Sequence, residues 1–133
     1  MHPVRRWSLA VAVSILALAS FVAVAQAPGI KRSLLQRVDL QGSEAKECVL
    51  GSAEIPAGGS AGRHFHHGIE VGYVVEGESE ILVDGEAPRR VKAGESYSIP
   101  ARRPHDAKAI GGPVKVVATY VVEKGKPLAE PVK

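Results

Sequence analysis

The chain has 133 residues, of which 45% are hydrophobic, 23% charged and 5% aromatic, with a formal net charge of +3. This length and composition predict a single folded domain with a core of Val, Ile, Leu and Ala, and they exclude a largely disordered chain. The single cysteine, Cys48, excludes an internal disulfide.

The first 25 residues have the pattern of a secretory signal peptide. The basic stretch MHPVRRWS precedes an uncharged apolar run, and Ala23-Val24-Ala25 supplies a small-residue cleavage site. We predict cleavage after Ala25 and a periplasmic or secreted protein. An uncleaved anchor is the alternative, and only in that case is membrane contact expected. Arg5 and Arg6 leave the general secretion and twin-arginine routes both open.

Loss of residues 1–25 removes two arginines and leaves 15 basic against 14 acidic residues. A net charge of +1 gives no basis for binding nucleic acid or a membrane surface. Neither partner is therefore expected.

Everything after the leader reads as β structure, because short Val- and Ile-rich segments alternate with Gly and Pro. No segment has helical periodicity. Asp84-Gly85 predicts a tight type I′ hairpin, and Gly111-Gly112-Pro113 predicts another turn. Strands are expected at residues 47–55, 64–66, 70–75, 78–83, 89–92, 96–99, 105–110 and 114–122.

Regular strand spacing without a linker predicts one all-β sandwich or barrel, over residues 46–123. Residues 26–45 form an N-terminal arm, in which Ile30–Leu40 is ambiguous and compatible with an edge strand. The polar, proline-bearing residues 124–133 are expected to form a flexible tail.

Three histidines and a glutamate form a candidate metal site. His64 and His66 lie two apart on a predicted strand and so share a face. Glu70 keeps the even spacing, Gly72 leaves room on the same face, and His105 opens a later strand. Three imidazoles and a carboxylate suit Fe, Mn, Co, Ni, Cu or Zn. Taken singly, each histidine is better explained as an ordinary surface or core residue.

Two spaced motifs resemble those of the cupin superfamily, in particular its small single-domain bacterial members. In the second motif, Arg102 stands where glycine is usual, and Ala109 where asparagine is usual. The first motif matches at Gly58, His64, His66, Glu70 and Gly77, and the second at Gly94, Pro100 and His105.

The resemblance implies a cupin-type β-barrel, a double-stranded jelly roll, with one divalent metal (Fe, Mn, Ni, Cu or Zn) inside. Its ligands would be His64, His66, Glu70 and His105. If position 102 requires a positive φ, arginine there costs on the order of 1 kcal/mol. Small cupins usually form dimers through sheet edges, so a homodimer is expected, with Ile30–Leu40 as the exchanged segment.

Other residues near the ligands have two interpretations each. His67 is either a proton carrier behind the ligands or a loop residue at the barrel mouth. Arg63 and Arg102 either bind an anionic substrate or form a solvated rim, together with Arg103 and Lys108. Tyr97 either contacts the substrate or packs in the core.

The resemblance to small quercetinase-like cupins implies a metal-dependent dioxygenase acting on a small phenolic or enolic acid. Glu70 would then serve as general base. Because fold and ligands are shared across many reactions, two alternatives stay open. One is a non-catalytic metal- or ligand-binding protein, and the other is a sugar or small-acid isomerase.

Overall fold

The computed structural model describes residues 29–133, and the predicted signal peptide, residues 1–25, lies outside them. The described residues form ten β-strands and no helix. Accordingly, this part of the chain holds no helix with the length and apolar character needed to cross a membrane.

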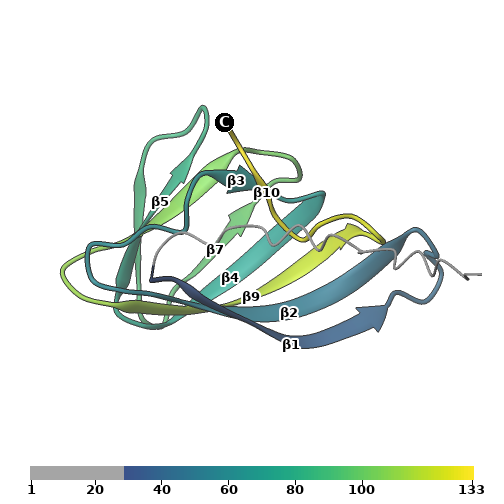
Figure 1. Cartoon of the computed structure of the whole chain (residues 1–133), viewed down its shortest axis with the longest axis horizontal. Helices are drawn as coiled ribbons and strands as arrows, with labels where there is room; N and C mark the ends of the chain where they lie inside the picture. The colour runs from purple at the N-terminus through teal and green to yellow at the C-terminus, as the bar shows by residue number, and fades with distance from the viewer. Residues whose placement is uncertain (1–28) are drawn as a thin grey trace, which may run out of the picture.

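The strands form two antiparallel five-stranded sheets, packed as a jelly roll (Figure 1). The first sheet has the order β1 (Lys31–Asp39), β2 (Lys46–Ile55), β9 (Val114–Glu123), β4 (Gly68–Glu76) and β7 (Ser96–Ile99). The second has the order β10 (Glu130–Pro131), β3 (His64–Phe65), β8 (His105–Ala109), β5 (Glu78–Val83) and β6 (Arg89–Lys92). The all-β prediction is thereby confirmed.

Alternating side chains direct each strand's apolar face into the space between the sheets. In β4, Glu70, Gly72 and Val74 are buried, whereas the intervening Val71 and Tyr73 are exposed. The core combines both sheets, with the most deeply buried side chains at Ile55, Val74, Val91, Ile99 and Val114.

The predicted strands agree with the observed ones to within two residues at each end. The ambiguous segment Ile30–Leu40 contains the edge strand β1, which pairs only with β2. His66 follows the end of β3 and lies in the short connection to β4.

The prediction of a type I′ hairpin at Asp84-Gly85 is wrong. A type I′ turn requires positive φ at both central residues, but only Gly85 has it, at 83°. The connection from β5 to β6 runs over residues 84–88. Asp84 is held by tertiary contacts, because its N–H donates to the carbonyl of Pro104 at 3.0 Å and its carboxylate pairs with Arg63.

The C-terminal segment, expected to be a flexible tail, instead joins the second sheet. Strand β10 pairs with β3, and the N–H of Val132 donates to the carbonyl of Arg63 at 3.0 Å. The segment forms hydrogen bonds with backbone groups at the edge of β3. Its polar, proline-bearing composition does not indicate this role. The chain end therefore lies beside β3 (Figure 1).

Candidate metal centre

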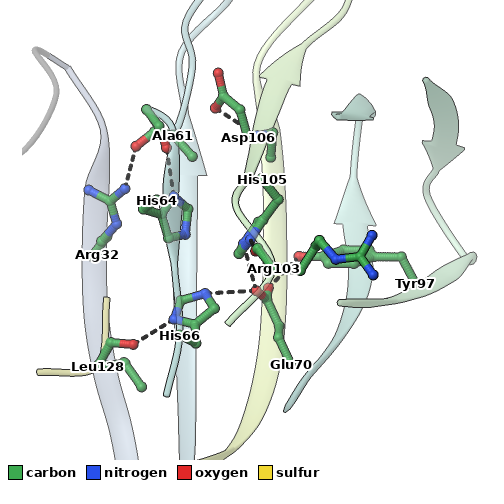
Figure 2. A network of polar contacts seen from close by, with 12 residues as sticks. Arg32, Ala61, His64, His66, Glu70, Tyr97, Arg103, His105, Asp106 and Leu128 are labelled. Carbon is green, nitrogen blue, oxygen red and sulfur yellow. Dashed lines mark hydrogen bonds and ion pairs between the residues drawn. The ribbon is translucent and has the colours of Figure 1, made fainter. Parts of the chain in front are cut away.

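Four polar side chains from separate parts of the chain converge between the two sheets (Figure 2). β3 supplies His64, β4 supplies Glu70 and β8 supplies His105, while His66 comes from the connection after β3. One ring nitrogen from each histidine lies within 4.8 Å of the others. The cluster is buried: His66 is 4% exposed and Glu70 5% exposed.

Main-chain carbonyls determine which ring nitrogen carries the proton in all three imidazoles. Nδ1 of His64, His66 and His105 lies 2.6, 2.5 and 2.9 Å from the carbonyl oxygens of Gly62, Leu128 and Arg103, respectively. A carbonyl can only accept a hydrogen bond, so Nδ1 must carry the proton. The lone pair of each neutral ring is then on Nε2, a common arrangement in metal-binding histidines.

Glu70 supplies a fourth donor atom. Its Oε2 lies 2.9 Å from Nε2 of His66 and 3.3 Å from Nε2 of His105. Neither buried nitrogen has a hydrogen-bond partner of good geometry among the described residues. At these distances a proton or a metal cation must lie between the carboxylate and each ring nitrogen. Three nitrogens and one carboxylate oxygen therefore fit a first-row divalent metal.

The cluster also sets its own protonation. Burial would raise the pKa of Glu70, but the contacts with His105 and His66 outweigh it and lower that pKa far below its usual range. Burial lowers the pKa of His64 to about 4. Burial alone would lower the pKa of His105, yet the Glu70 carboxylate raises it on balance. At neutral pH, Glu70 is therefore anionic and His64 neutral, as ligands must be.

A tyrosine beneath the cluster orients the carboxylate. The hydroxyl of Tyr97 donates to Oε1 of Glu70 at 2.9 Å, which leaves Oε2 facing the imidazoles. Burial, followed by the charge of Glu70, raises the pKa of Tyr97, so the hydroxyl stays protonated. Gly72 makes room for it, because a Cβ there would lie 2.1 Å from Cζ of Tyr97.

The cluster forms one wall of a cavity of about 80 Å³ between the sheets. Tyr97 and Tyr120 lie on its polar side, and the Tyr120 ring packs against His66 with centroids 4.7 Å apart. Arg32 of β1 also lines it. The remaining wall is apolar and consists of Ile30, Ala53, Ile55, Ala61, Ile81, Ala107, Val116, Leu128 and Ala129.

Arg63 and Arg102, which were interpreted either as substrate contacts or as part of a solvated rim, lie outside this cavity. Arg63 pairs with Asp84, and Arg102 pairs with Glu123 at 2.5 Å, both on the surface. The arginine that does line the cavity, Arg32, was missed because its segment was ambiguous. Alternation from the buried Ile30 would have placed Arg32 on the inward face.

His67 does not contact the cluster. Its Nε2 lies 2.5 Å from Oε1 of Glu130, and its ring packs edge-on against Phe65. No contact between His67 and the candidate ligands therefore supports its interpretation as a proton carrier. Tyr97, which was expected either in the core or at the substrate, donates a hydrogen bond to Glu70.

Arg102 has a φ of 60°, the left-handed conformation that glycine tolerates best. It is the one non-glycine residue with positive φ in residues 29–133. Its N–H donates to the carbonyl of His66 at 2.9 Å, so this turn holds the chain at a candidate ligand. The strain of about 1 kcal/mol expected at this position therefore falls beside the site.

Several solved structures have a similar fold, among them a lyase and a cyclase. The DMSP lyase DddQ from Ruegeria pomeroyi DSS-3 aligns at 21% identity and a TM-score of 0.64, over 77% of this chain and 51% of that one. The polyketide cyclase RemF from Streptomyces resistomycificus aligns at 24% identity and a TM-score of 0.61, over 81% and 74%. An RmlC-like cupin from Shewanella frigidimarina NCIMB 400 aligns at 26% identity and a TM-score of 0.58, over 73% and 79%.

The chain spans about half the length of the DMSP lyases that it resembles. No curated protein sequence matches it significantly. The family described as Cupin domain matches residues 51–122, more than half of the 133 residues. This match covers His64, His66, Glu70 and His105 and all strands from β3 to β8. Fold, motifs and family match agree, and the chain belongs to the cupin family.

Proposed function

We propose that this cupin is a metal-dependent enzyme that acts on a small acid in the cavity between its sheets. One observation carries the proposal: three imidazoles, each with Nδ1 fixed on a main-chain carbonyl, bring one ring nitrogen each within 4.8 Å of the others, and Nε2 of His66 and of His105 lies beside Glu70. Ordinary surface histidines do not need a fixed tautomer, whereas ligands do. His64, His66, His105 and Glu70 would hold the metal.

A bound metal would polarise a coordinated substrate oxygen and, if it were Fe, Mn, Ni or Cu, would also give access to oxygen chemistry. The chain itself would orient the substrate and move its proton. Glu70 is the candidate base, because it is ionised and faces the cavity. The hydroxyl of Tyr97 donates a hydrogen bond to Oε1 of Glu70 and so fixes the orientation of the carboxylate. The apolar wall limits the water that reaches the reacting atoms.

The reaction that we favour is oxygenation of a small enolic acid. Support comes from the sequence motifs and from the donor set, which leaves two positions open on an octahedral ion. A DMSP lyase and a polyketide cyclase have a similar fold, so the fold alone does not determine the reaction. The small cavity favours compact substrates over multi-ring phenols.

Metal analysis of the protein isolated from its own compartment, combined with oxygen uptake on a panel of enolic and phenolic acids, tests the proposal. Iron, manganese, nickel or copper at one per chain with substrate-dependent uptake would support it. Zinc at one per chain without uptake would favour a non-catalytic binding protein. Conversion of a sugar or small acid without oxygen uptake would favour an isomerase.

We also propose export, with cleavage after Ala25. The basic n-region and apolar run support it. N-terminal sequencing of protein from the periplasm or medium should then begin at Gln26. A chain retained at full length in the membrane fraction would identify an uncleaved anchor instead.

A further inference from the structure

The arginines of this chain differ in whether they have an acidic partner. Residues 29–133 contain seven arginines, and five of them lie within ion-pair distance of a carboxylate: Arg37, Arg63, Arg90, Arg102 and Arg103. The other two, Arg32 and Arg89, each donate to a single main-chain carbonyl, of Ala61 at 2.7 Å and of Ser96 at 2.6 Å. Only Arg32 lines the cavity.

Arg32 lacks a carboxylate within ion-pair distance in the described part of the chain, and residues 1–28 contain no Asp or Glu. Arg32 as a whole is exposed on β1, but burial of part of its side chain lowers the pKa of the guanidinium. A cation at a cavity wall without a counter-ion favours the binding of an anion there.

The position of Arg32 relative to the candidate metal centre suits a ligand with two functional ends. Its guanidinium is anchored to Ala61, three residues before His64, so it is fixed beside the histidine cluster (Figure 2). Tyr120 lines the same cavity and is influenced by both groups, because its pKa is raised by burial and by Glu70 and lowered by the charge of Arg32. The cation and the metal ligands therefore face the same cavity.

We propose that Arg32 binds the carboxylate of a small aliphatic acid whose other polar end reaches the histidine cluster. A guanidinium has a planar fork of donors that matches a carboxylate, and one main-chain bond leaves other donors available. The apolar wall, with Ile55, Ala107 and Val116, would contact the short carbon chain between them.

The cavity volume limits the size of this ligand. One water requires roughly 10–15 Å³ of such space. A cavity of about 80 Å³ therefore holds on the order of five to eight waters, or a ligand with a similar number of non-hydrogen atoms. Short hydroxy, oxo or unsubstituted acids fit, whereas benzoate-sized acids do not. This inference rests on the proposed function for the metal end, but the carboxylate end stands on Arg32 alone.

Ligand-detected NMR on the zinc-loaded and metal-free protein tests the inference, with glycolate and propanoate as probes. Propanamide serves as the neutral control and benzoate as the size control. We expect Arg32→Gln to weaken binding of both acids about tenfold or more, and Arg32→Lys to retain part of it. Arg89→Gln is the matched control, because Arg89 also lacks a carboxylate partner but lies away from the cavity, and it should bind as the wild type does.

Zinc stoichiometry, measured separately, distinguishes the two claims. If the wild type binds propanoate through Arg32 but takes up no metal, the proposed function fails and the carboxylate end of this inference stands. If zinc binds at one per chain and Arg32→Gln binds propanoate like the wild type, the inference is overturned. Equal binding of propanamide, or of benzoate, would also overturn it. Circular dichroism of each variant confirms that the sheets are intact.

Discussion

The hydroxyl of Tyr97 lies 2.9 Å from Oε1 of Glu70 and donates a hydrogen bond to it within the buried cluster. The two residues come from neighbouring strands, in which Glu70 pairs with Ile99 and Gly72 pairs with Tyr97. One carboxylate oxygen is therefore held by the protein, and the other faces the imidazoles.

Replacing Tyr97 by Phe removes this hydrogen bond while keeping the ring. We expect metal affinity to fall about 10- to 100-fold, the usual effect of losing a group that orients a metal ligand. Competition with a chromophoric chelator measures the affinity. Tyr73→Phe is the control, because Tyr73 is exposed on the outer face of the same sheet and should have no effect. Unchanged affinity in Tyr97→Phe would show that Tyr97 does not orient Glu70.

Replacing His66 by Ala should abolish tight metal binding but leave the fold intact. His66 lies in a connection outside the strands, so both sheets can still form. A metal that binds the native state raises its melting temperature, and we expect this increase in the wild type but not in His66→Ala. His67→Ala, which changes a histidine outside the cluster, should retain it. Full metal retention in His66→Ala would contradict the ligand assignment.

The metal-free protein should lose stability as the pH falls from about 6.5 to about 4. Burial lowers the pKa of His64 to about 4, so in this window the unfolded chain binds a proton there and the native chain does not. The loss attributable to His64 approaches about 3 kcal/mol at the acid end. Below the usual Glu pKa, Glu70 adds a loss of the same sign, because its pKa is lowered. The pKa of His105 is raised, so its contribution is present below about pH 6.5 and lost at higher pH.

Urea unfolding in the presence of a chelator, from pH 4 to pH 7.5, measures this dependence. His64→Gln should show a shallower decline on the acid side than the wild type, whereas His67→Gln should not. Identical slopes for the wild type and His64→Gln would show that burial does not hold His64 neutral.

Arg102 should be a strained position that glycine relieves. Both Arg102→Gly and Arg102→Ala remove the surface ion pair with Glu123, so comparing them isolates the backbone. With φ at 60°, glycine should be more stable than alanine by about 1 kcal/mol. Denaturant unfolding gives the difference. Equal stability would mean that the turn adapts to a side chain without cost.

The homodimer that the cupin resemblance implies has a candidate interface on β1. This edge strand exposes Leu34 at 60% and Leu35 at 54%, beside a bulge in its pairing with β2. An exposed apolar edge favours pairing with another chain. Sedimentation should show a dimer that Leu35→Lys weakens, whereas Val71→Lys, on the outer face of β4, leaves it unchanged. A monomeric wild type, or a dimer disrupted only by Val71→Lys, would exclude β1 as the interface.

The sequence by itself determined which segments become strands and which side chains share a face. His64, Glu70 and Gly72 could be assigned to one side because alternation is a property of neighbouring residues. The cupin resemblance, in which glycine is usual at position 102, raised a positive φ there as a condition, and the structure has φ at 60°. These features depend on a few residues at a time, and local sterics fix them.

Only the tertiary structure decided which groups complete the site. His66 directs Nδ1 at the carbonyl of Leu128, 62 residues away, in a segment whose composition predicted a flexible tail. Arg32, from an ambiguous segment, lines the cavity, whereas Arg63 and Arg102, the arginines considered as substrate contacts, do not. Such contacts join segments that are distant in sequence, and their partners depend on how the two sheets pack, which no local pattern specifies.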